Sequence, residues 1–374
     1  PPILTPILKF IKSELVLFIA WTAAALTLFF VPIDQAYLGY VDFSVLSILF
    51  CLMAVVAGFL KTGVFDVLTH RLMQLSSNLK SIALLLVCAC FFSAMLVTND
   101  VALLTFVPLT LGIMGAVGPK PLVFVLVMET IAANIGSMLT PIGNPQNLYL
   151  YSFYDMNIGD FLRIVAPVCL AGFLIIAAFV LLTPAGSLPL SANKPAAIRN
   201  RPHLLVYGLL FLLAILTVLH LVDYRITLAI TIAALLFCDP KLLAAVDYSL
   251  LLTFVAFFVF VGNLGRIPWV KAELSSFLAG REFIAGVLVS QIISNVPAAM
   301  MLSGFTSQAS PLLLGVNVGG LGTLVASLAS LISFKLYAKS KNAKTGLFFL
   351  VFTACNLAVL ALLVAVVFAA GLCG

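Results

Sequence analysis

Long apolar runs recur along the chain and restrict what it can fold into. They are about 17 to 25 residues long, the length that an α-helix needs to cross a hydrocarbon core of ~30 Å. Residues 15–31, 43–60, 161–182 and 347–370 are clear examples. Their apolar residues are continuous and do not alternate as they would in barrel strands. Only 9% of the residues are charged, whereas soluble chains average roughly 25%. We therefore predict an all-α polytopic membrane protein that lies in a lipid bilayer.

The basic residues predict the orientation of the chain. When the N-terminus is placed in the cytoplasm and the chain crosses at each long apolar segment, 14 of the 19 Lys and Arg residues fall inside. The five outside are Arg163, Arg225, Arg266, Lys271 and Arg281. Such a positive-inside bias orients membrane proteins, and it accounts for the net charge of +6 without a nucleic-acid partner. We expect a multi-pass protein of the bacterial inner membrane, with the N-terminus cytoplasmic and the C-terminus outside.

A short polar phrase occurs twice in this apolar chain. The first copy is Asn134-x-Gly136-x-x-x-Thr140 and the second is Asn317-x-Gly319-x-x-x-Thr323. Each copy follows another polar interruption, T-N-D at 98–100 and S-N-V-P at 294–297. Each half also opens a membrane helix with a related phrase, V-D-F-S at 41–44 and V-D-Y-S at 246–249, followed by a short amphipathic stretch. Four features in the same order indicate an internal repeat.

Charge counting predicts that the two copies are inverted in the membrane. It places Asp42 outside and Asp247 inside. We therefore predict two inverted repeats, residues 1–182 and 203–374. A cytoplasmic linker at 183–202, rich in Pro, Ser and basic residues, joins them. Inverted repeats give secondary transporters two access states from one packing scheme.

The polar interruptions predict a re-entrant helical hairpin and a discontinuous transmembrane helix in each half. Residues 82–97 and 101–117 could each be a full span or one arm of a hairpin, and the second half presents the same choice. The T-N-D tip carries no Lys or Arg, which favours hairpins with tips at 98–100 and 294–297. Helix breaks are predicted at 140–147 and 320–330. Pro141, Gly143 and Pro145 prevent a continuous helix across the first break.

Two acidic residues, Asp100 and Glu129, lie within predicted membrane segments. An ionisable group at that depth is a functional candidate by default. Asp100 lies beside backbone groups that the interruption frees, which suits Na⁺ coordination or proton uptake. The alternative role for Asp100 is to cap the helix that begins at Val101. Glu129 is either a proton site or a structural acceptor for hydroxyl and amide donors.

The broken segments also provide neutral polar groups for a substrate. Helix ends aimed at the middle of the membrane expose N–H groups to an anion and C=O groups to a cation. One broken helix can therefore hold a substrate beside its coupling ion. The predicted substrate-binding residues are Thr98, Asn99, Asn134, Ser137, Thr140, Gly143, Asn144, Asn147, Ser294, Asn295, Asn317 and Thr323. The predicted ion-coupling residues are Asp100, Asn99, Gly143, Asn295 and Glu129, with a candidate Na⁺ site at Asn99, Asp100 and Gly143.

Motifs for enzymatic chemistry or ATP hydrolysis are absent from the sequence. It contains no Walker loop, no dinucleotide fingerprint and no nucleophile–base pair. We therefore expect no enzyme and no ATPase within this chain, and no cofactor other than Na⁺ or H⁺ as a coupling ion.

The polar segments resemble those of the ion transporter superfamily. The resemblance rests on LVTNDVALLTFVPLTL, ANIGSMLTPIGNPQNL, SQIISNVPAAMML and VNVGGLGTLVASLA. This group includes divalent-anion/sodium symporters, citrate permeases, arsenite efflux permeases and a sodium–proton antiporter family, and the chain looks most similar to the YbiR-like bacterial permeases. The resemblance implies two re-entrant hairpins, a homodimer and elevator-type movement of a transport domain against a scaffold.

The hairpin tips depart from the pattern of the symporters. In that group Ser-Asn-Thr at both tips binds sodium and substrate, and the matching positions here are Thr98 to Asp100 and Ser294 to Val296. Asp100 replaces a neutral Thr and Val296 removes a hydroxyl. The T-N-D tip is similar to that of the arsenite and sodium–proton branches.

Three functions follow as alternatives. The first is a secondary active transporter that moves a small anion or organic acid with Na⁺ or H⁺. The second is a Na⁺/H⁺ antiporter that uses Asp100, and the third is a proton-driven efflux permease for a metalloid such as arsenite.

Overall fold

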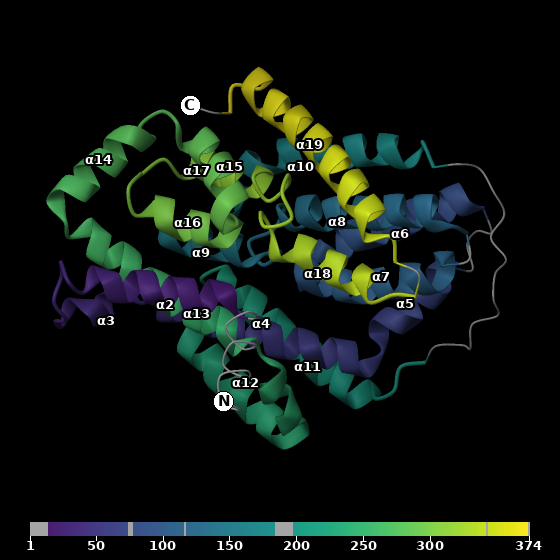
Figure 1. Ribbon diagram of the computed structural model, residues 1–374. Helices are drawn as coiled ribbons and strands as arrows, with labels where there is room; N and C mark the ends of the chain where they lie inside the picture. The colour runs from purple at the N-terminus through teal and green to yellow at the C-terminus, as the bar shows by residue number, and fades with distance from the viewer. Residues whose placement is uncertain (1–13, 74–77, 116, 184–196, 342, 373–374) are drawn as a thin grey trace, which may run out of the picture.

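The computed structural model describes residues 14–372 apart from 74–77, 116, 184–196 and 342, and every element in these ranges is helical. The helices form two bundles that lie against each other (Figure 1). The frame bundle consists of α2 (Leu15–Thr27), α3 (Ala36–Tyr40), α4 (Phe43–Thr62), α11 (Arg201–Val218), α12 (Tyr224–Cys238), the 3₁₀-helix η1 (Pro240–Ala245) and α13 (Tyr248–Gly265).

The hairpin bundle lies above the frame bundle in Figure 1. It consists of α6 (Leu79–Val97), α7 (Asn99–Met114), α8 (Pro119–Ser137), α9 (Pro145–Phe153), α10 (Ile158–Val180), α15 (Glu282–Ile293), α16 (Asn295–Ser303), α17 (Ala309–Val318), α18 (Leu328–Ala338) and α19 (Thr345–Ala369). Two short helices, α5 (Val64–Met73) and α14 (Pro268–Leu278), connect the bundles at the positions of the predicted amphipathic stretches.

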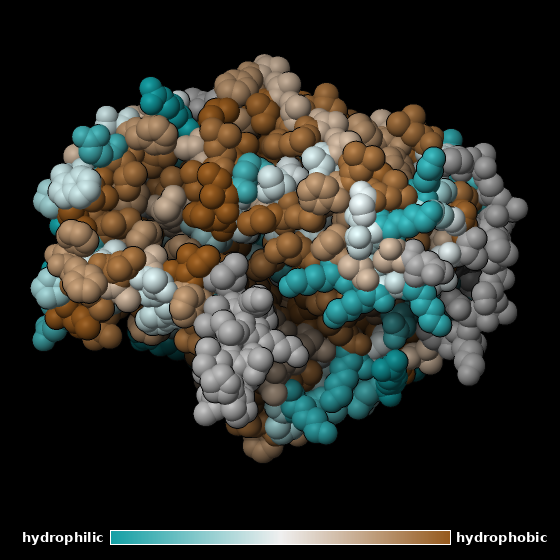
Figure 2. Space-filling view, viewed as in Figure 1, coloured by the Kyte–Doolittle hydropathy of each residue, from teal (hydrophilic) through white to brown (hydrophobic). Residues whose placement is uncertain are grey.

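Seven helices of the described residues are long and apolar enough to cross a membrane, namely α4, α6, α8, α10, α11, α13 and α19. Within α8, 83% of the apolar window is buried, whereas the share is 28% in α11 and in α19. Figure 2 shows apolar side chains over the middle of one face and polar ones towards its left and right edges. These features confirm the predicted all-α membrane protein and make α8 its buried centre.

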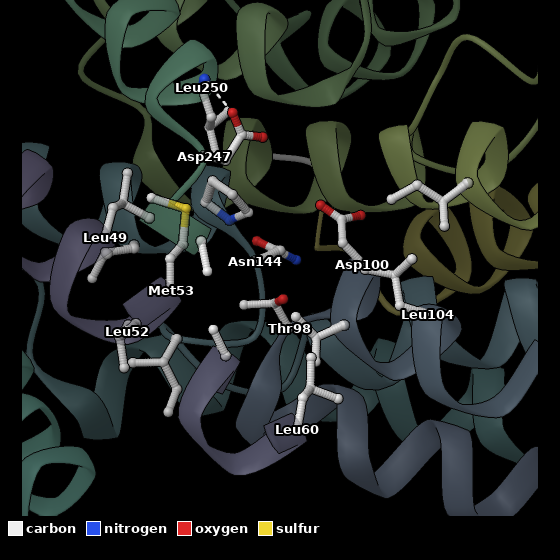
Figure 3. Close-up of a pocket in the computed structure, with 17 residues that line it drawn as sticks. Leu49, Leu52, Met53, Leu60, Thr98, Asp100, Leu104, Asn144, Asp247 and Leu250 are labelled. Atoms are coloured by element: carbon white, nitrogen blue, oxygen red, sulfur yellow. Dashed lines mark hydrogen bonds between the residues drawn. The ribbon is translucent and has the colours of Figure 1, made fainter. Parts of the chain in front are cut away.

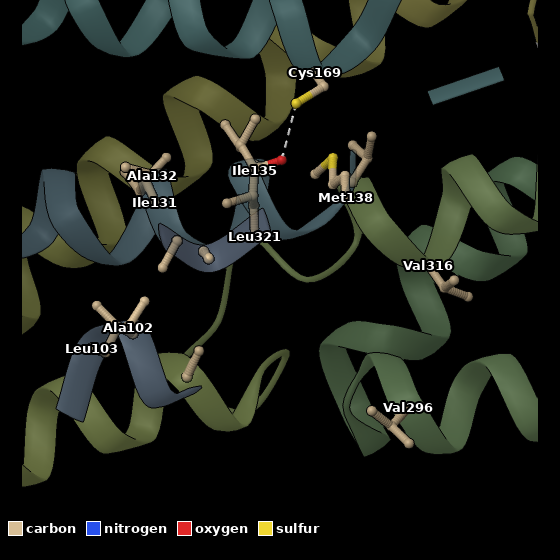
Figure 4. Packing of buried hydrophobic residues seen from close by; sticks show 14 of the residues in the cluster. Ala102, Leu103, Ile131, Ala132, Ile135, Met138, Cys169, Val296, Val316 and Leu321 are labelled. Carbon is tan, nitrogen blue, oxygen red and sulfur yellow. Dashed lines mark hydrogen bonds between the residues drawn. The ribbon is translucent and has the colours of Figure 1, made fainter. Parts of the chain in front are cut away.

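The core around α8 joins helices from distant parts of the chain. In Figure 4 the Sγ of Cys169, from α10, donates to the carbonyl of Ile135 at 3.3 Å. Leu321, from the second half of the chain, belongs to the same buried cluster. The frame bundle has a smaller cluster of its own around Tyr207 and Leu235. The larger cluster continues from the hairpin bundle into α4 and α13 of the frame bundle, where it includes Leu49 and Phe258.

The first hairpin is formed by α6 and α7, which pack on α8 in opposite directions. Phe91 lies against Gly136 and Met95 against Thr140, so α6 runs parallel to α8. Asn99 binds Asn134 and Thr110 binds Glu129, so α7 runs antiparallel to it. One residue, Thr98, makes the turn between the two arms.

The second hairpin is formed by α15 and α16 in the same way. Its arms turn at the single residue Ser294. At the opposite end Thr306, just after α16, donates to Glu282 at the start of α15 (3.0 Å). The turn residues adopt nearly the same backbone conformation, with φ/ψ of 74°/153° at Thr98 and 76°/155° at Ser294.

Both predicted helix breaks exist, with somewhat different bounds. The first gap covers residues 138–144 and the second 319–327, where we predicted 140–147 and 320–330. Pro145 occupies the first turn of α9, where its missing N–H costs no hydrogen bond, so the helix resumes earlier than expected. The apolar run at 15–31 also differs, because α2 ends at Thr27 and a turn precedes Pro32.

The predicted linker at 183–202 lies mostly outside the described residues. Its described end contacts the connection between α4 and α5. The N–H of Arg199 donates to the carbonyl of Thr62 (3.0 Å), and its guanidinium lies 3.5 Å from Asp66.

Two crossed ion pairs connect the halves of the frame bundle. Lys61, at the end of α4, pairs with Asp239, and Arg266, after α13, pairs with Asp34 at 2.7 Å. Both basic residues lie 19 positions after the Asp that caps their helix, and both acids lie eight positions before such an Asp. The hydrogen bond from Lys61 lowers the pKa of Asp239, and that from Arg266 lowers the pKa of Asp34. Each half thus binds a loop of the other half.

Gly136 allows the close approach of α6 to α8 and provides a test of this packing. A Cβ at this position would lie 2.2 Å from the carbonyl oxygen of Phe91. We expect Gly136→Ala to cost about 1–3 kcal/mol, the usual penalty for overpacking, and to lower the melting temperature of the purified protein. Gly208→Ala in α11 is the matched control, because no atom lies within 4 Å of its Cβ position. Equal melting temperatures for the two variants would contradict the packing.

Candidate functional site

The two asparagines of the doubled phrase each bind the opposite half of the chain. The Oδ1 of Asn134 accepts from Ser327 (2.9 Å), and its Nδ2 lies 3.4 Å from the Oγ of Ser330. Asn317 accepts from Asn144 (3.2 Å) and donates to Asn147 (2.6 Å). The partners are equivalent, since they follow their own phrase's asparagine by ten and thirteen residues in both halves. The doubled asparagines therefore connect the two broken helices.

The threonines of the doubled phrase have equivalent contacts as well. Thr140 donates to the carbonyl of Met95, and Thr323 donates to the carbonyl of Gln291. Met95 and Gln291 each lie three residues before their hairpin turn. The threonine therefore binds the last turn of the first hairpin arm to the helix break in each half.

Each hairpin tip binds the helix break of its own half through the backbone. The N–H of Asn99 donates to the carbonyl of Gly143 (3.2 Å), and the N–H of Asn295 donates to that of Ala326 (2.9 Å). The preceding turn residues have positive φ, which is a strained conformation for Thr and Ser. Strain of this kind is found mostly at functional sites, where the surroundings enforce it.

Different side chains satisfy the carbonyls that the two breaks leave free. The Nδ2 of Asn147 donates to the carbonyls of Ser137, Met138 and Thr140 at 3.1–3.2 Å. In the second half the Nε2 of Gln291 donates to the carbonyls of Gly319 and Leu321 at 2.8–2.9 Å. Backbone groups without a partner are costly away from water, so these amides stabilise the interruptions.

These contacts bring eight helix ends to one place. The N-termini of α7, α9, α16 and α18 and the C-termini of α6, α8, α15 and α17 adjoin the hairpin turns and the two breaks. N-termini carry partial positive charge and C-termini partial negative charge. The site can therefore stabilise an anion and a cation close together without a buried Lys or Arg.

A crevice of about 240 Å³ lies between this site and the frame bundle. Figure 3 shows Thr98, Asp100 and Asn144 of the hairpin bundle on one side, and Leu49, Met53 and Asp247 of the frame bundle on the other. Asp247 caps α13 by accepting from the N–H of Leu250 (2.9 Å). The crevice thus holds one carboxylate from each half of the chain.

The predicted ion ligands Asn99, Asp100 and Gly143 are neighbours in the structure. The Oδ1 of Asn99 accepts from the N–H of Asp100 (3.0 Å), and the carbonyl of Gly143 accepts from the N–H of Asn99. Each of these oxygens retains a second lone pair. Their arrangement is compatible with a cation beside Asp100. The Na⁺ site at these residues stays a prediction.

Glu129 lies in the core, away from the crevice. It is fully buried, and its Oε1 accepts from Thr110 at 2.5 Å. Its Oε2 has no partner among the described residues. The structural role proposed for Glu129 thus has an observed donor, and its role in ion coupling stays a prediction.

The structure brings most of the predicted substrate-binding residues together, although several are already bonded to one another. Asn99, Asn134, Ser137, Asn144, Asn147 and Asn317 form one buried network. Ser294 and Asn295 bind the second break at Ala326. Thr323 is exposed and lies apart at Gln291. Thr98, Asp100 and Asn144 line the crevice.

Two residues of the site were not predicted from the sequence. Asp247 was assigned only as the start of a membrane helix, and the sequence holds no sign that it faces Asp100 across a crevice. Gln291 had a usable signal, because it is the only amide side chain in α15.

The crossed amides can be tested by removing one of them. Asn317→Ala leaves the buried Oδ1 of Asn147 without its donor, which should cost about 1–3 kcal/mol and lower the melting temperature by several degrees. The loss in Asn147→Ala/Asn317→Ala should be smaller than the sum of the single losses, because the two side chains share a bond. Strictly additive losses would contradict the contact.

Comparison with known proteins gives the same picture. The chain matches the citrate transporter family, CitMHS, over residues 7–313. It is 34% identical over 315 residues to the uncharacterized transporter MJ0456 of Methanocaldococcus jannaschii, covering 83% of this chain and 85% of that protein. It is 30% identical over 315 residues to the inner membrane protein YbiR of Escherichia coli, covering 82% and 84%.

A solved structure has the same fold. The YdaH transporter of Alcanivorax borkumensis, whose topology was described as unusual, aligns with a TM-score of 0.56 at 15% identity. The alignment covers 91% of this chain and 89% of YdaH. The chain is a multi-span membrane transporter that belongs to the citrate transporter family of the ion transporter superfamily.

Proposed function

We propose that this protein is a secondary active transporter that moves a small anion or organic acid together with Na⁺ or H⁺. The observation that carries the proposal is the meeting of the hairpin turns and helix breaks described above. Four helix N-termini place partial positive charge there for an anion, and four C-termini place partial negative charge there for a cation. Helix ends of this kind form the substrate and ion sites of secondary transporters.

Asp100 is the proposed coupling residue. It lies in the first turn of α7 and lines the crevice, next to Asn99 and the first helix break. The crevice-lining residues of the frame bundle include another acid, Asp247, and no Lys or Arg. A carboxylate without a basic partner is suited to exchange a small cation with the aqueous phase.

The proposed movement is of the elevator type, in which the hairpin bundle slides against the frame bundle. The apolar cluster around Tyr207 and Leu235 supports this, because it lies within the frame bundle and can keep its packing while the hairpin bundle moves. The main contacts between them are made by α9 on α4 and by α16 on α13. We further propose a homodimer with a cytoplasmic N-terminus and an external C-terminus, as the family resemblance and the charge bias suggest.

A Na⁺/H⁺ exchanger is the second candidate function. The facing carboxylates of Asp100 and Asp247 favour it, since a pair of acids attracts cations more than anions. In this alternative Asp100 binds Na⁺ and H⁺ in turn and no organic substrate moves.

Flux into proteoliposomes separates the two functions. Labelled anions, including citrate and other di- and tricarboxylates, are offered with and without a Na⁺ or pH gradient. We expect uptake of an anion that depends on one of these gradients. Cation exchange without anion flux would favour the exchanger and contradict anion transport.

Replacing the proposed coupling residue gives a second test. Asp100→Asn keeps the shape of the side chain and removes its charge, so we expect loss of gradient-driven flux by at least about tenfold with unchanged folding. Asp160→Asn is the matched control, because Asp160 lies in the first turn of α10, outside the crevice. Unchanged Na⁺ and pH dependence in Asp100→Asn would assign Asp100 the role of a helix cap only.

A further inference from the structure

The two bundles meet at two faces that the repeat makes equivalent. At the first face lies the crevice lined by Met53, Ala57 and Leu60 of α4 and by Asp247. At the second face lies a hollow lined by Phe258, Gly262 and Gly265 of α13 and by Asp42. Met53, Ala57 and Leu60 follow Asp42 at the same spacing as Phe258, Gly262 and Gly265 follow Asp247.

Contacts between the bundles differ at these two faces. At the second face Ser152 of α9 donates to Asp42 of the frame bundle (3.0 Å). One turn earlier on the same helix, Tyr149 packs on Phe258 with a ring separation of 5.8 Å. Tyr149 and Ser152 also line the hollow, so the hairpin bundle contacts the frame bundle directly at the wall of this hollow.

At the first face, no ion pair joins the equivalent polar residues among those that the structure describes. The counterpart of Tyr149 is Ile332 of α18, since each follows its phrase's asparagine by 15 residues, and Ile332 lines the crevice. The counterpart of Ser152 is Lys335, one turn further along α18 and exposed. Lys335 forms no ion pair with any described residue, and Asp247 is also exposed.

We propose that Lys335 is a gating residue that pairs with Asp247 when the crevice beside Asp100 closes. This inference rests on the proposed transport function. When the hairpin bundle moves to its other position, contacts now made at the second face are replaced by their equivalents at the first face. The Ser152–Asp42 hydrogen bond then breaks, and the Lys335–Asp247 ion pair forms over the crevice.

With this pair, the two positions of the hairpin bundle are held by different kinds of contact to the frame bundle. One position is held by a neutral donor on Asp42, and the other by a cation on Asp247. When Lys335 approaches Asp247, its ammonium group neutralises the Asp247 carboxylate. That carboxylate then no longer helps Asp100 to attract a cation. The closed crevice therefore stops attracting cations from its own side, which favours release towards the opposite face.

A zero-length carbodiimide cross-link tests the pair in the unmodified protein. The reagent joins a Lys amine to an Asp carboxyl only where the two are in contact, and mass spectrometry identifies the joined peptides. Protein in liposomes should yield an Asp247–Lys335 amide. The Lys61–Asp239 pair within the frame bundle is the internal standard, because it is already formed. Mixing isotopically labelled and unlabelled protein distinguishes links within one chain from links between chains.

A substitution at the other face should shift the cross-link. Ser152→Asp places a second carboxylate against Asp42, so it should weaken the present docking and raise the Asp247–Lys335 yield about two- to fivefold relative to the standard, as is typical of an exposed charge pair. Lys339, one turn beyond Lys335 on α18's C-terminal end, is the matched control and should give no such increase.

The outcomes are separable from those of the flux experiments. An Asp247–Lys335 yield that stays at the level of Asp247–Lys339, both in the natural sequence and in Ser152→Asp, would overturn the gating pair. A cross-link that responds to Ser152→Asp supports the pair even if every tested solute fails to move. In that case only the assigned substrate class is wrong.

Discussion

A buried network of amides at two helix breaks is the constraint on which the rest of the structure depends. Interrupting a helix within a membrane frees backbone carbonyls and N–H groups that lipid cannot satisfy. Here Asn147 and Gln291 bind the freed carbonyls, and Asn134 and Asn317 bind the restarting helix of the opposite half. Neither break is complete without residues from elsewhere, so the two halves form one site.

Residues of the two halves of the chain also bind each other in the frame bundle, where they join parts of one bundle. Lys61 and Arg266 pair with loops of the opposite half at the ends of α4 and α13. These pairs join parts of one bundle, whereas the contacts between bundles are few and unequal at the two faces. The proposed two-position movement requires each bundle to keep its own packing while the contacts between the bundles change.

Much of the fold could be predicted from the sequence because its signals are local. The hairpin turns at Thr98 and Ser294 and the gaps after Ser137 and Val318 follow from polar residues, Gly and Pro within apolar runs. The bounds of the breaks were less accurate, since Pro145 begins a helix as readily as it ends one. The doubled phrase predicted a repeat and substrate-binding asparagines, whereas the packing adds that each asparagine binds the broken helix of the opposite half.

The site was harder to predict because its contacts join residues far apart in the chain. Asn134 meets Ser327, and Asp100 shares a crevice with Asp247, and no spacing in the sequence encodes either approach. Asp247 caps α13, and this local role is enough to explain an Asp at that position. The sequence therefore gives no sign that Asp247 also lines the crevice. Periodicity and motifs identify elements, whereas only the packing shows which capping residue lies at a crevice.

The central claim is that the hairpin bundle moves as a unit against the frame bundle. Double electron–electron resonance, which measures distances between nitroxide labels on the protein in liposomes, tests it most directly. One pair spans the bundles, at Tyr248 and Leu328, and two control pairs lie within a bundle, at Phe43 with Tyr248 and at Phe153 with Leu328; all four positions are solvent- or lipid-exposed. We expect two distance populations for the spanning pair and one for each control. A single population for all three pairs, with or without substrate and ion gradients, would contradict the account.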